Sequence, residues 1–217
     1  PASERTSEYR EGPFMGYRYY DTSMVLFRYP FGYGLSYTEF AYSALEVDEK
    51  GVQLTVTNVG ERDGAEVVQL YVGFPDSVVF RPQKELKGFQ KVFLKAGESK
   101  RVHIPFDDKT FRYWNVKTGQ WEIEEGEYLL MVGASVSDIR LSGKLWVAGT
   151  TKEIPYEKKK LPSYYSGRIS NVGAEEFEVL LGHPVPDGKW KGELGINDAI
   201  CQMYYAKSRL ARLVYRI

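Results

Sequence analysis

Short runs of β-branched and aromatic residues, bounded by glycine, proline or aspartate, dominate the middle of the chain. Three clear runs are 89–94 (FQKVFL), 101–104 (RVHI) and 128–132 (YLLMV). Each has the length and composition of a β-strand, and turn residues recur between the runs at regular intervals. This punctuation is typical of an all-β sandwich rather than of alternating strands and helices, so the pattern predicts about seven antiparallel strands in two sheets.

Two segments predict hairpins. Residues 53–59 (QLTVTNV) alternate apolar and polar side chains, as an antiparallel strand with one buried face does. The turn-forming stretch 60–64 (GERDG) follows, and we predict that 66–72 (EVVQLYV) returns as the paired strand. Residues 114–121 (WNVKTGQW) predict a second hairpin, with Gly119 at its tip and its two tryptophans close together.

The N-terminal stretch has a different character. Residues 1–35 are rich in glycine, proline and tyrosine and show no helical period, so we expect an extended, irregular arm. Within the arm, residues 12–21 alternate aromatic and polar side chains, as an edge strand or a segment packed on a partner would. Exposed aromatic strips usually mark an interface. Packing between domains is therefore the favoured interpretation of this strip, and a sugar-stacking surface is the alternative.

The C-terminal third is polar at first and then helical in pattern. Residues 150–162 are charged and contain prolines, which predicts a linker or a segment laid over the surface. Residues 174–181 (AEEFEVLL) predict a short helix that ends at Gly182. From a cap at Asn197, apolar residues recur at helical spacing, which predicts one basic amphipathic helix over 197–217.

Composition and charge narrow the function. The sequence has 29 basic and 29 acidic side chains, so it has no net charge that would gather nucleic acid or an anionic membrane. Cys201 is the one cysteine, which rules out an internal disulfide and predicts a packed or half-buried thiol. The lack of disulfides also favours a cytoplasmic bacterial setting.

No catalytic or metal-binding constellation occurs at a recognisable spacing, so we predict no cofactor and no metal. His103 and His183 have no cysteine, serine or ligand partner near them in the sequence. Glu85 is expected to pair with a neighbouring lysine. Four glutamates crowd the end of the second hairpin, where we expect a solvated turn: Glu122, Glu124, Glu125 and Glu127.

Several motifs, in one order, resemble a known family. The string 27–40 (FRYPFGYGLSYTEF) resembles the entry to the fibronectin type III-like domain of the family 3 glycoside hydrolases, the β-glucosidase family. Residues 11–21 (EGPFMGYRYYD) look like the segment before that entry, and 81–89 (RPQKELKGF) is similar to a loop within the domain. The similarity continues to 138–141 (DIRL) and covers roughly residues 9–150. An ordered series of motifs is far more specific than any one of them.

The resemblance implies a domain without catalytic residues. In that family the nucleophile comes from a barrel domain and the acid/base typically from the following α/β domain, and no position of this chain matches those motifs. We therefore expect three parts. Residues 1–35 are the arm from a preceding catalytic domain, 36–149 are an immunoglobulin- or fibronectin type III-like antiparallel β-sandwich, and 150–217 are a linker with a small helical extension.

The favoured function is structural: the domain docks on the catalytic domains of a parent glycoside hydrolase and stabilises them. The residues predicted to make this contact are Tyr17, Tyr19, Phe31, Tyr33, Tyr37, Arg81 and Glu85. A carbohydrate-binding module is the alternative, with Trp114 and Trp121 as stacking platforms beside the tyrosines of the arm. A third hypothesis is that the C-terminal helix joins copies of the chain into a homo-oligomer. No nucleic-acid or membrane partner is expected.

Overall fold

The chain folds into two compact units. The computed structural model describes residues 7–186, 190–196 and 198–216. Residues 11–172 make up the larger unit, and the described parts of both chain ends make up the smaller one. The larger unit is wider than the sandwich predicted at 36–149, because the arm from Glu11 on and the segment after the last strand belong to it.

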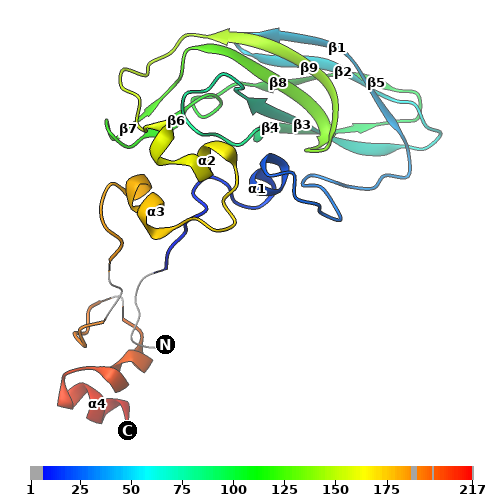
Figure 1. Ribbon diagram of the computed structural model, residues 1–217. Coiled ribbons are helices and arrows are strands. Elements are labelled where there is room, and N and C mark those ends of the chain that lie inside the picture. The colour runs from blue at the N-terminus through cyan, green and yellow to red at the C-terminus, as the bar shows by residue number, and fades with distance from the viewer. Residues whose placement is uncertain (1–6, 187–189, 197, 217) are drawn as a thin grey trace. The chain divides into compact units, whose positions relative to one another are not determined.

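The larger unit is a sandwich of two antiparallel sheets (Figure 1). Three strands form one sheet in the order β1-β2-β5: β1 (Phe40–Asp48), β2 (Gly51–Asn58) and β5 (Ser99–Pro105). Four strands form the other in the order β4-β3-β8-β9: β4 (Glu85–Leu94), β3 (Gly64–Gly73), β8 (Gly126–Ser135) and β9 (Asp138–Val147). A two-stranded hairpin pairs β6 (Tyr113–Asn115) with β7 (Gln120–Glu122). The predicted all-β sandwich is confirmed.

Alternating apolar residues of the two sheets meet in the core. In β2 and β3 every second side chain points between the sheets and is almost fully buried: Val52, Leu54, Val56, Val68, Leu70 and Val72. Leu94 of β4 and Leu130 of β8 lie in the same cluster. Burying one aliphatic side chain contributes about 1.5–3 kcal/mol, so this layer is the main source of stability for the sandwich.

The predicted hairpin between β2 and β3 is wrong. β2 pairs with β1 and β5, whereas β3 pairs with β4 and β8, so neither strand has a free edge for the other. The connection crosses from one sheet to the other instead. Buried Asn58 holds this corner, because its Nδ2 donates to the carbonyl oxygens of Arg62 (2.7 Å) and Leu94 (3.2 Å).

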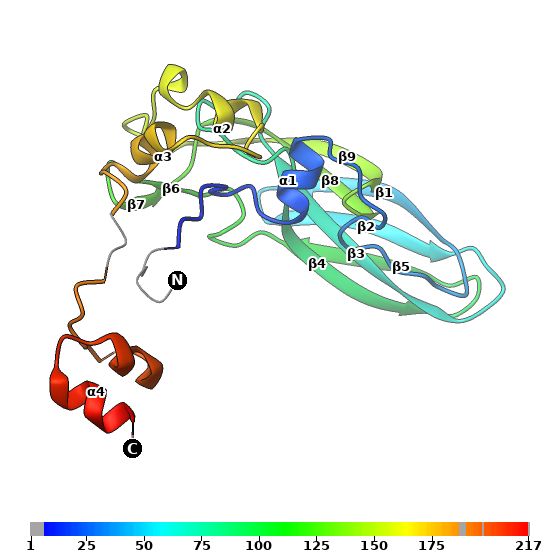
Figure 2. The ribbon, with the colours of Figure 1, turned by 60° about the horizontal axis from the view of Figure 1, so that its bottom comes forward.

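The arm contains a short helix where the sequence predicts an edge strand or an irregular segment. α1 (Tyr17–Thr22) has six residues and begins after Gly16, whose φ is 56°. Six residues make fewer than two turns, which is too short for a helical period to show in the sequence. So short a helix depends on packing against the rest of the fold. Figures 1 and 2 show α1 against the four-stranded sheet.

After β9 the chain returns across one end of the sandwich. η1 (Lys158–Lys160) and α2 (Pro162–Ser166) are both short, and Tyr164 in α2 is buried. The rings of Tyr156 and Tyr164 lie 5.1 and 5.2 Å from the ring of Phe80. This part of the chain is therefore laid over the surface, which is one of the two forms that the sequence predicts.

The smaller unit is helical. α3 (Ala174–Leu181) confirms the predicted short helix, and Gly182 ends it in the left-handed conformation, with a φ of 77°. Within the described part of the chain, no helix is long and apolar enough to cross a membrane.

The predicted single helix over 197–217 is wrong. Two short helices take its place, η2 (Ile200–Tyr205) and α4 (Arg209–Tyr215), and Ala206 between them has extended backbone angles. The hydroxyl of Ser208 accepts from the N–H of Ala211 (3.3 Å) and caps α4, so a local cap competes with helix continuation here. The predicted cap at Asn197 lies outside the described residues. Cys201 is exposed, so the prediction of a packed thiol is also wrong.

Candidate docking surface and polar pocket

A buried amide fastens the arm to the outer face of the four-stranded sheet. Gln69 of β3 points away from the core, yet it is only 4% exposed, because the arm covers it. Its Nε2 donates to the carbonyl oxygens of Gly32 (3.1 Å) and Ala134 (2.6 Å), and its Oε1 accepts from the hydroxyl of Tyr71 (2.6 Å). This one side chain therefore joins the arm to β3 and β8.

The contact with Gln69 requires a glycine at position 32. Its φ is 82°, and a Cβ built on it would lie 2.0 Å from Oε1 of Gln69. A side chain at this position would meet both a strained backbone and a steric clash. One residue earlier, the carbonyl oxygen of Phe31 accepts from the N–H of Val136 (3.0 Å), which gives the arm a second anchor next to β8.

α1 is fastened to the same face through Tyr17. The Tyr17 ring stacks on Phe31, with 4.3 Å between ring centroids, and its hydroxyl accepts from the N–H of Leu86 (2.8 Å). Burial raises the pKa of the Tyr17 hydroxyl above its ordinary value. A partly buried ion pair adds to this attachment, since Nζ of Lys84 lies 2.8 Å from Oδ1 of Asp21. Tyr17 and Phe31, both predicted to dock on another domain, thus make their contacts largely within this chain.

The other predicted docking residues are spread over the larger unit. Glu85 pairs with Lys87 at 3.4 Å, as the sequence predicts. Tyr19 is partly buried beside Tyr20, with 5.6 Å between their ring centroids. Tyr37 is 91% exposed. The docking role of these residues stays a prediction.

The outer side of the arm presents apolar side chains to solvent. The most exposed are Leu26 (96%), Leu35 (88%) and Met24 (85%), together with Tyr37. The arm also helps to line an open hollow of about 360 Å³, whose walls are almost entirely rings: Tyr17, Tyr20, Phe27, Tyr29, Pro30, Phe31 and Val136. We call this set of side chains and the hollow the arm surface. Contiguous exposed apolar patches usually mark an interaction site.

Arg81 anchors the loop between β3 and β4. Its side chain forms a buried ion pair with Glu124 at 2.8 Å, and its guanidinium carbon lies 5.0 Å from the ring centroid of Tyr113. Glu124 also accepts from the N–H of Val78 (2.8 Å) and from the hydroxyl of Ser77 (2.6 Å). The Glu124 carboxylate therefore fixes the conformation of this loop through three of its residues, Ser77, Val78 and Arg81.

Two of the four glutamates near the second hairpin are buried, so the prediction of a solvated turn is wrong for Glu122 and Glu124. Glu122 accepts hydrogen bonds from the Thr118 hydroxyl (2.7 Å) and from Nδ2 of Asn115 (2.8 Å). These hydrogen bonds hold the pKa of Glu122 below its ordinary value, and the bond from Thr118 has the largest effect. The donors to Glu122 lie within the hairpin itself. The donors to Glu124 lie in a loop that is distant in the sequence, so no local pattern reveals its burial.

The predicted tryptophan hairpin is confirmed, since Trp114 and Trp121 face each other across β6 and β7 and Gly119 has a φ of 63°. Their rings are 5.4 Å apart at an angle of 74°, so they do not form one flat platform. The guanidinium carbon of Arg112 lies over the Trp121 ring, 4.4 Å from its centroid, and Trp121 remains 55% exposed. Sugar stacking at this hairpin stays a prediction, and neither ring offers an extended coplanar surface for it.

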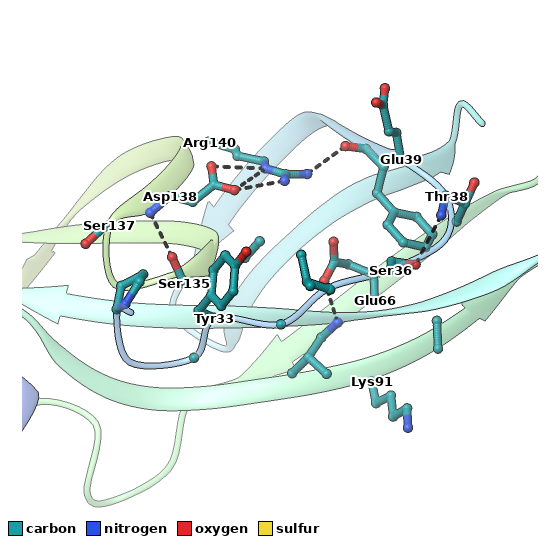
Figure 3. A pocket seen from close by; sticks show the side chains of 18 residues that line it. Tyr33, Ser36, Thr38, Glu39, Glu66, Lys91, Ser135, Ser137, Asp138 and Arg140 are labelled. Carbon is teal, nitrogen blue, oxygen red and sulfur yellow. Dashed lines mark hydrogen bonds and ion pairs between the residues drawn. The ribbon is translucent and has the colours of Figure 1, made fainter. Parts of the chain in front are cut away.

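A polar pocket of about 720 Å³ lies between the 30–40 segment and the ends of β3, β8 and β9 (Figure 3). Pro30 lines both this pocket and the hollow of the arm surface, and Leu35 of the arm surface also lines the pocket, so the two hollows adjoin. The side chains that give the pocket its chemistry are Tyr33, Glu66, Ser135, Asp138 and Arg140. The sequence motifs singled out Tyr33 alone as a functional residue, since the other side chains come from three separate strands.

Arg140 is held in place by several partners. Its Nη1 donates to the carbonyl oxygen of Phe40 (2.6 Å), and its Nη2 lies 2.9 Å from Oδ2 of Asp138. Its guanidinium carbon lies 4.7 Å from the ring centroid of Tyr42. The side chain is nevertheless 29% exposed, so a fixed guanidinium faces the pocket.

Glu66 is a half-buried carboxylate in the same pocket. Its Oε1 accepts from the N–H of Val67 (2.8 Å), and the described residues give its Oε2 no hydrogen bond. Burial raises the pKa of Glu66, and the nearby positive charge of Arg140 opposes this rise only in part. A carboxylate oxygen of Glu66 that can accept a further hydrogen bond thus lies in the same pocket as the fixed guanidinium of Arg140. Among the described residues there is no group of three or more side chains suited to hold a metal ion.

Residues 66–136 match the family model of the fibronectin type III-like domain. The chain is 46% identical over 160 residues to thermostable β-glucosidase B of Acetivibrio thermocellus, which covers 70% of this chain and 21% of the relative. It is also 46% identical over 160 residues to an exo-α-(1→6)-L-arabinopyranosidase of Bifidobacterium breve, which covers 71% and 21%. Fungal β-glucosidases match as well.

Solved structures give the same result. The crystal structure of the family 3 (GH3) β-glucosidase of Bifidobacterium adolescentis superposes with a TM-score of 0.64 at 40% identity, covering 75% of this chain and 26% of that one. The chain thus spans about a fifth to a quarter of the length of the proteins it matches.

Proposed function

The chain carries the fibronectin type III-like domain of the family 3 glycoside hydrolases, and from that premise we propose that it is a non-catalytic domain that docks on the catalytic part of a β-glucosidase-type enzyme and stabilises it. About four fifths of each relative lies outside the matched region, which leaves ample chain to supply a partner.

The arm surface is the observation that carries this proposal. Gln69 anchors the arm at Gly32 and Tyr17 anchors α1, yet Leu26, Leu35 and Met24 remain exposed. Interface cores combine apolar side chains with shape that is fixed before binding, because ordering them on binding costs affinity. The arm surface has both properties.

The buried carboxylates support a structural role. Glu122 and Glu124 each hold several hydrogen bonds from their own domain, and Glu124 also holds Arg81. A general acid or nucleophile in glycoside hydrolysis needs a second carboxyl group across a sugar-sized cleft and access to substrate. These two side chains are used instead to fix a hairpin and a loop.

A chimera tests the docking role. Residues 11–172 would replace the matching segment of the Bifidobacterium adolescentis β-glucosidase, whose structure the chain resembles. The expected result is an active enzyme that loses thermal stability when Leu26 and Leu35 are both changed to aspartate, because the two charges would be buried unpaired at the interface. The measurement is residual glucosidase activity after heating.

The matched control is Trp146→Asp. Trp146 is also exposed (67%) but lies on β9, outside the arm surface. If the control chimera and the double-aspartate chimera lose activity at the same temperature, the arm surface is not the docking site.

A second candidate role, homo-oligomerisation, is favoured by the smaller unit. Ile200 and Leu210 are 75% and 70% exposed, and Leu213 and Val214 are about half exposed. Deleting residues 194–217 should lower the number of chain copies per particle if these side chains join copies of the chain. Multi-angle light scattering gives this number as particle mass divided by chain mass, and an unchanged number would reject the idea.

A further inference from the structure

We propose that the polar pocket binds a neutral, hydroxyl-rich ligand, a mono- or disaccharide, with the Tyr33 ring against one face of a sugar and with Glu66 and Arg140 bonded to its hydroxyl groups. This site is not the tryptophan hairpin that the sequence suggests for carbohydrate. It also does not depend on the docking role, because Tyr33, Glu66 and Arg140 do not belong to the arm surface, although Leu35 and Pro30 of that surface line the pocket as well.

The first step concerns size and shape. Small-molecule sites in proteins are concave and have volumes of about 300–1,000 Å³, with a few polar groups placed to orient the ligand. The polar pocket has a volume of about 720 Å³ and is open on one side. It can therefore admit one or two sugar rings while leaving the end of a longer glycan in solvent.

The second step concerns fixed donors and free acceptors. Arg140 is already held by Phe40 and Asp138, so binding would not need to order its side chain. Oε2 of Glu66 accepts no hydrogen bond from the described residues, so it is available to a ligand. A ligand whose groups both donate and accept, as each hydroxyl does, can bond to both at once.

The third step concerns charge. Arg140 and Asp138 form an ion pair, so their charges largely cancel, and burial makes Glu66 easier to protonate than an ordinary glutamate. The remaining charged side chains that line the pocket are one anion and one cation, Glu39 and Lys91. Figure 3 shows both pointing away from its centre. An anion or a cation would each meet a group of its own sign here, whereas a neutral ligand meets none.

The fourth step concerns the aromatic wall. Tyr33 lines the pocket, and its ring is backed by that of Tyr29, with 5.5 Å between centroids and 29° between planes. The side chain remains about half exposed. A supported, partly open ring suits the C–H face of a pyranose, whose hydroxyl edge then points to the polar side chains. The tryptophan hairpin lacks this combination, because its two rings meet at 74° and the Arg112 guanidinium lies over the Trp121 ring.

The test is an NMR titration of the isotopically labelled 217-residue chain with glucose, cellobiose and, at matched ionic strength, glucuronate. We expect saturable shifts of backbone amides at 32–39, 66–67 and 135–140 with the two neutral sugars, and weaker binding of glucuronate. Affinity in the millimolar range is expected for so small a ligand.

Two variants and a control make the test specific. Tyr33→Ala removes the aromatic ring that would lie against the sugar. Glu66→Gln keeps the shape of the side chain but replaces the carboxylate acceptor by an amide. Each variant should weaken cellobiose binding by about tenfold. Trp121→Ala should leave it unchanged. Amides of β5, none of whose residues lines the pocket, report whether each variant is folded.

Three results would overturn the proposal: no saturable shift with either sugar, unchanged affinity in Tyr33→Ala, or shifts confined to residues 113–122. The last would move the site to the tryptophan hairpin. None of them bears on the chimera, so failure of this proposal and failure of the docking role can be told apart.

Discussion

Gln69 shows how much of the arm's position rests on one side chain. A buried amide that loses a partner costs about 1–3 kcal/mol, whereas a satisfied one is close to neutral. The Gln69 amide keeps its three hydrogen bonds only when Gly32 of the arm, Ala134 of β8 and Tyr71 of β3 are in place together. The amide therefore selects one placement of the arm and penalises others.

Replacing Gly32 by alanine should loosen the arm. The left-handed φ and the clash with Gln69 predict a loss of about 2–4 kcal/mol in the free energy of unfolding, or detachment of the arm at a similar cost. Chemical denaturation measures the first. Faster hydrogen exchange at the N–H of Val136, which bonds to the arm, measures the second.

Gly34→Ala is the matched control, because a Cβ on Gly34 meets nothing within 4 Å and its φ is not in the left-handed region. We expect its stability to stay close to that of the original chain. Equal losses in both variants would mean that the contact with Gln69 is not what fixes the arm.

At the scale of elements, the hairpin of β6 and β7 carries a pH-dependent contribution to stability. The pKa of Glu122 is lower in the folded chain than in the unfolded chain, so its ionised form favours folding. This contribution is fully present above the ordinary glutamate pKa of about 4.3 and is lost as the pH falls through the folded value.

Glu122→Gln should therefore lower the thermal midpoint at pH 7, and the gap to the original chain should narrow as the pH is lowered towards 3. Scanning calorimetry over this range measures the gap. Glu125→Gln is the control, since Glu125 is exposed on the same segment, and it should leave the midpoint unchanged. A gap for Glu122→Gln that is constant with pH would contradict this account.

The elements that the sequence predicted are those whose signal is local. Alternation identified the strand at 53–59, the turn residues at 60–64 indicated a further strand at 66–72, and a glycine marked the end of α3. The pairing of β2 with β5 rather than β3 was not predictable, because it depends on which edges other strands occupy. The burial of Glu124 was missed for the same reason, since its partner Arg81 lies 43 positions away.

The polar pocket could not be predicted from the sequence for a related reason. Its fixed guanidinium belongs to a motif, 138–141, that helped identify the family but gave no hint of a site. Glu66 looked like an ordinary polar position in an alternating strand. Only the placement of β3, β8 and β9 side by side brings the two into one pocket with Tyr33.

At the scale of the whole molecule, the division into two units predicts that residues 11–172 fold without the chain ends. The core layer, the arm contacts and the Tyr164 cluster all lie within this range. A chain of these residues alone should melt in one cooperative transition, with nearly the same midpoint as the full chain. Calorimetry of the two chains side by side checks this, and a large fall in the midpoint would show that the smaller unit supports the sandwich.

The anchoring of the arm to β8 also has a consequence during synthesis. The arm is made early, but the N–H of Val136 that bonds to Phe31 belongs to a residue about 105 positions later. At translation rates of 5–20 residues per second, the arm waits about 5–20 s for its backing to leave the ribosome. Through that interval its aromatic residues have no sheet to lie on, so this stretch is where a nascent chain most needs the protection of a chaperone.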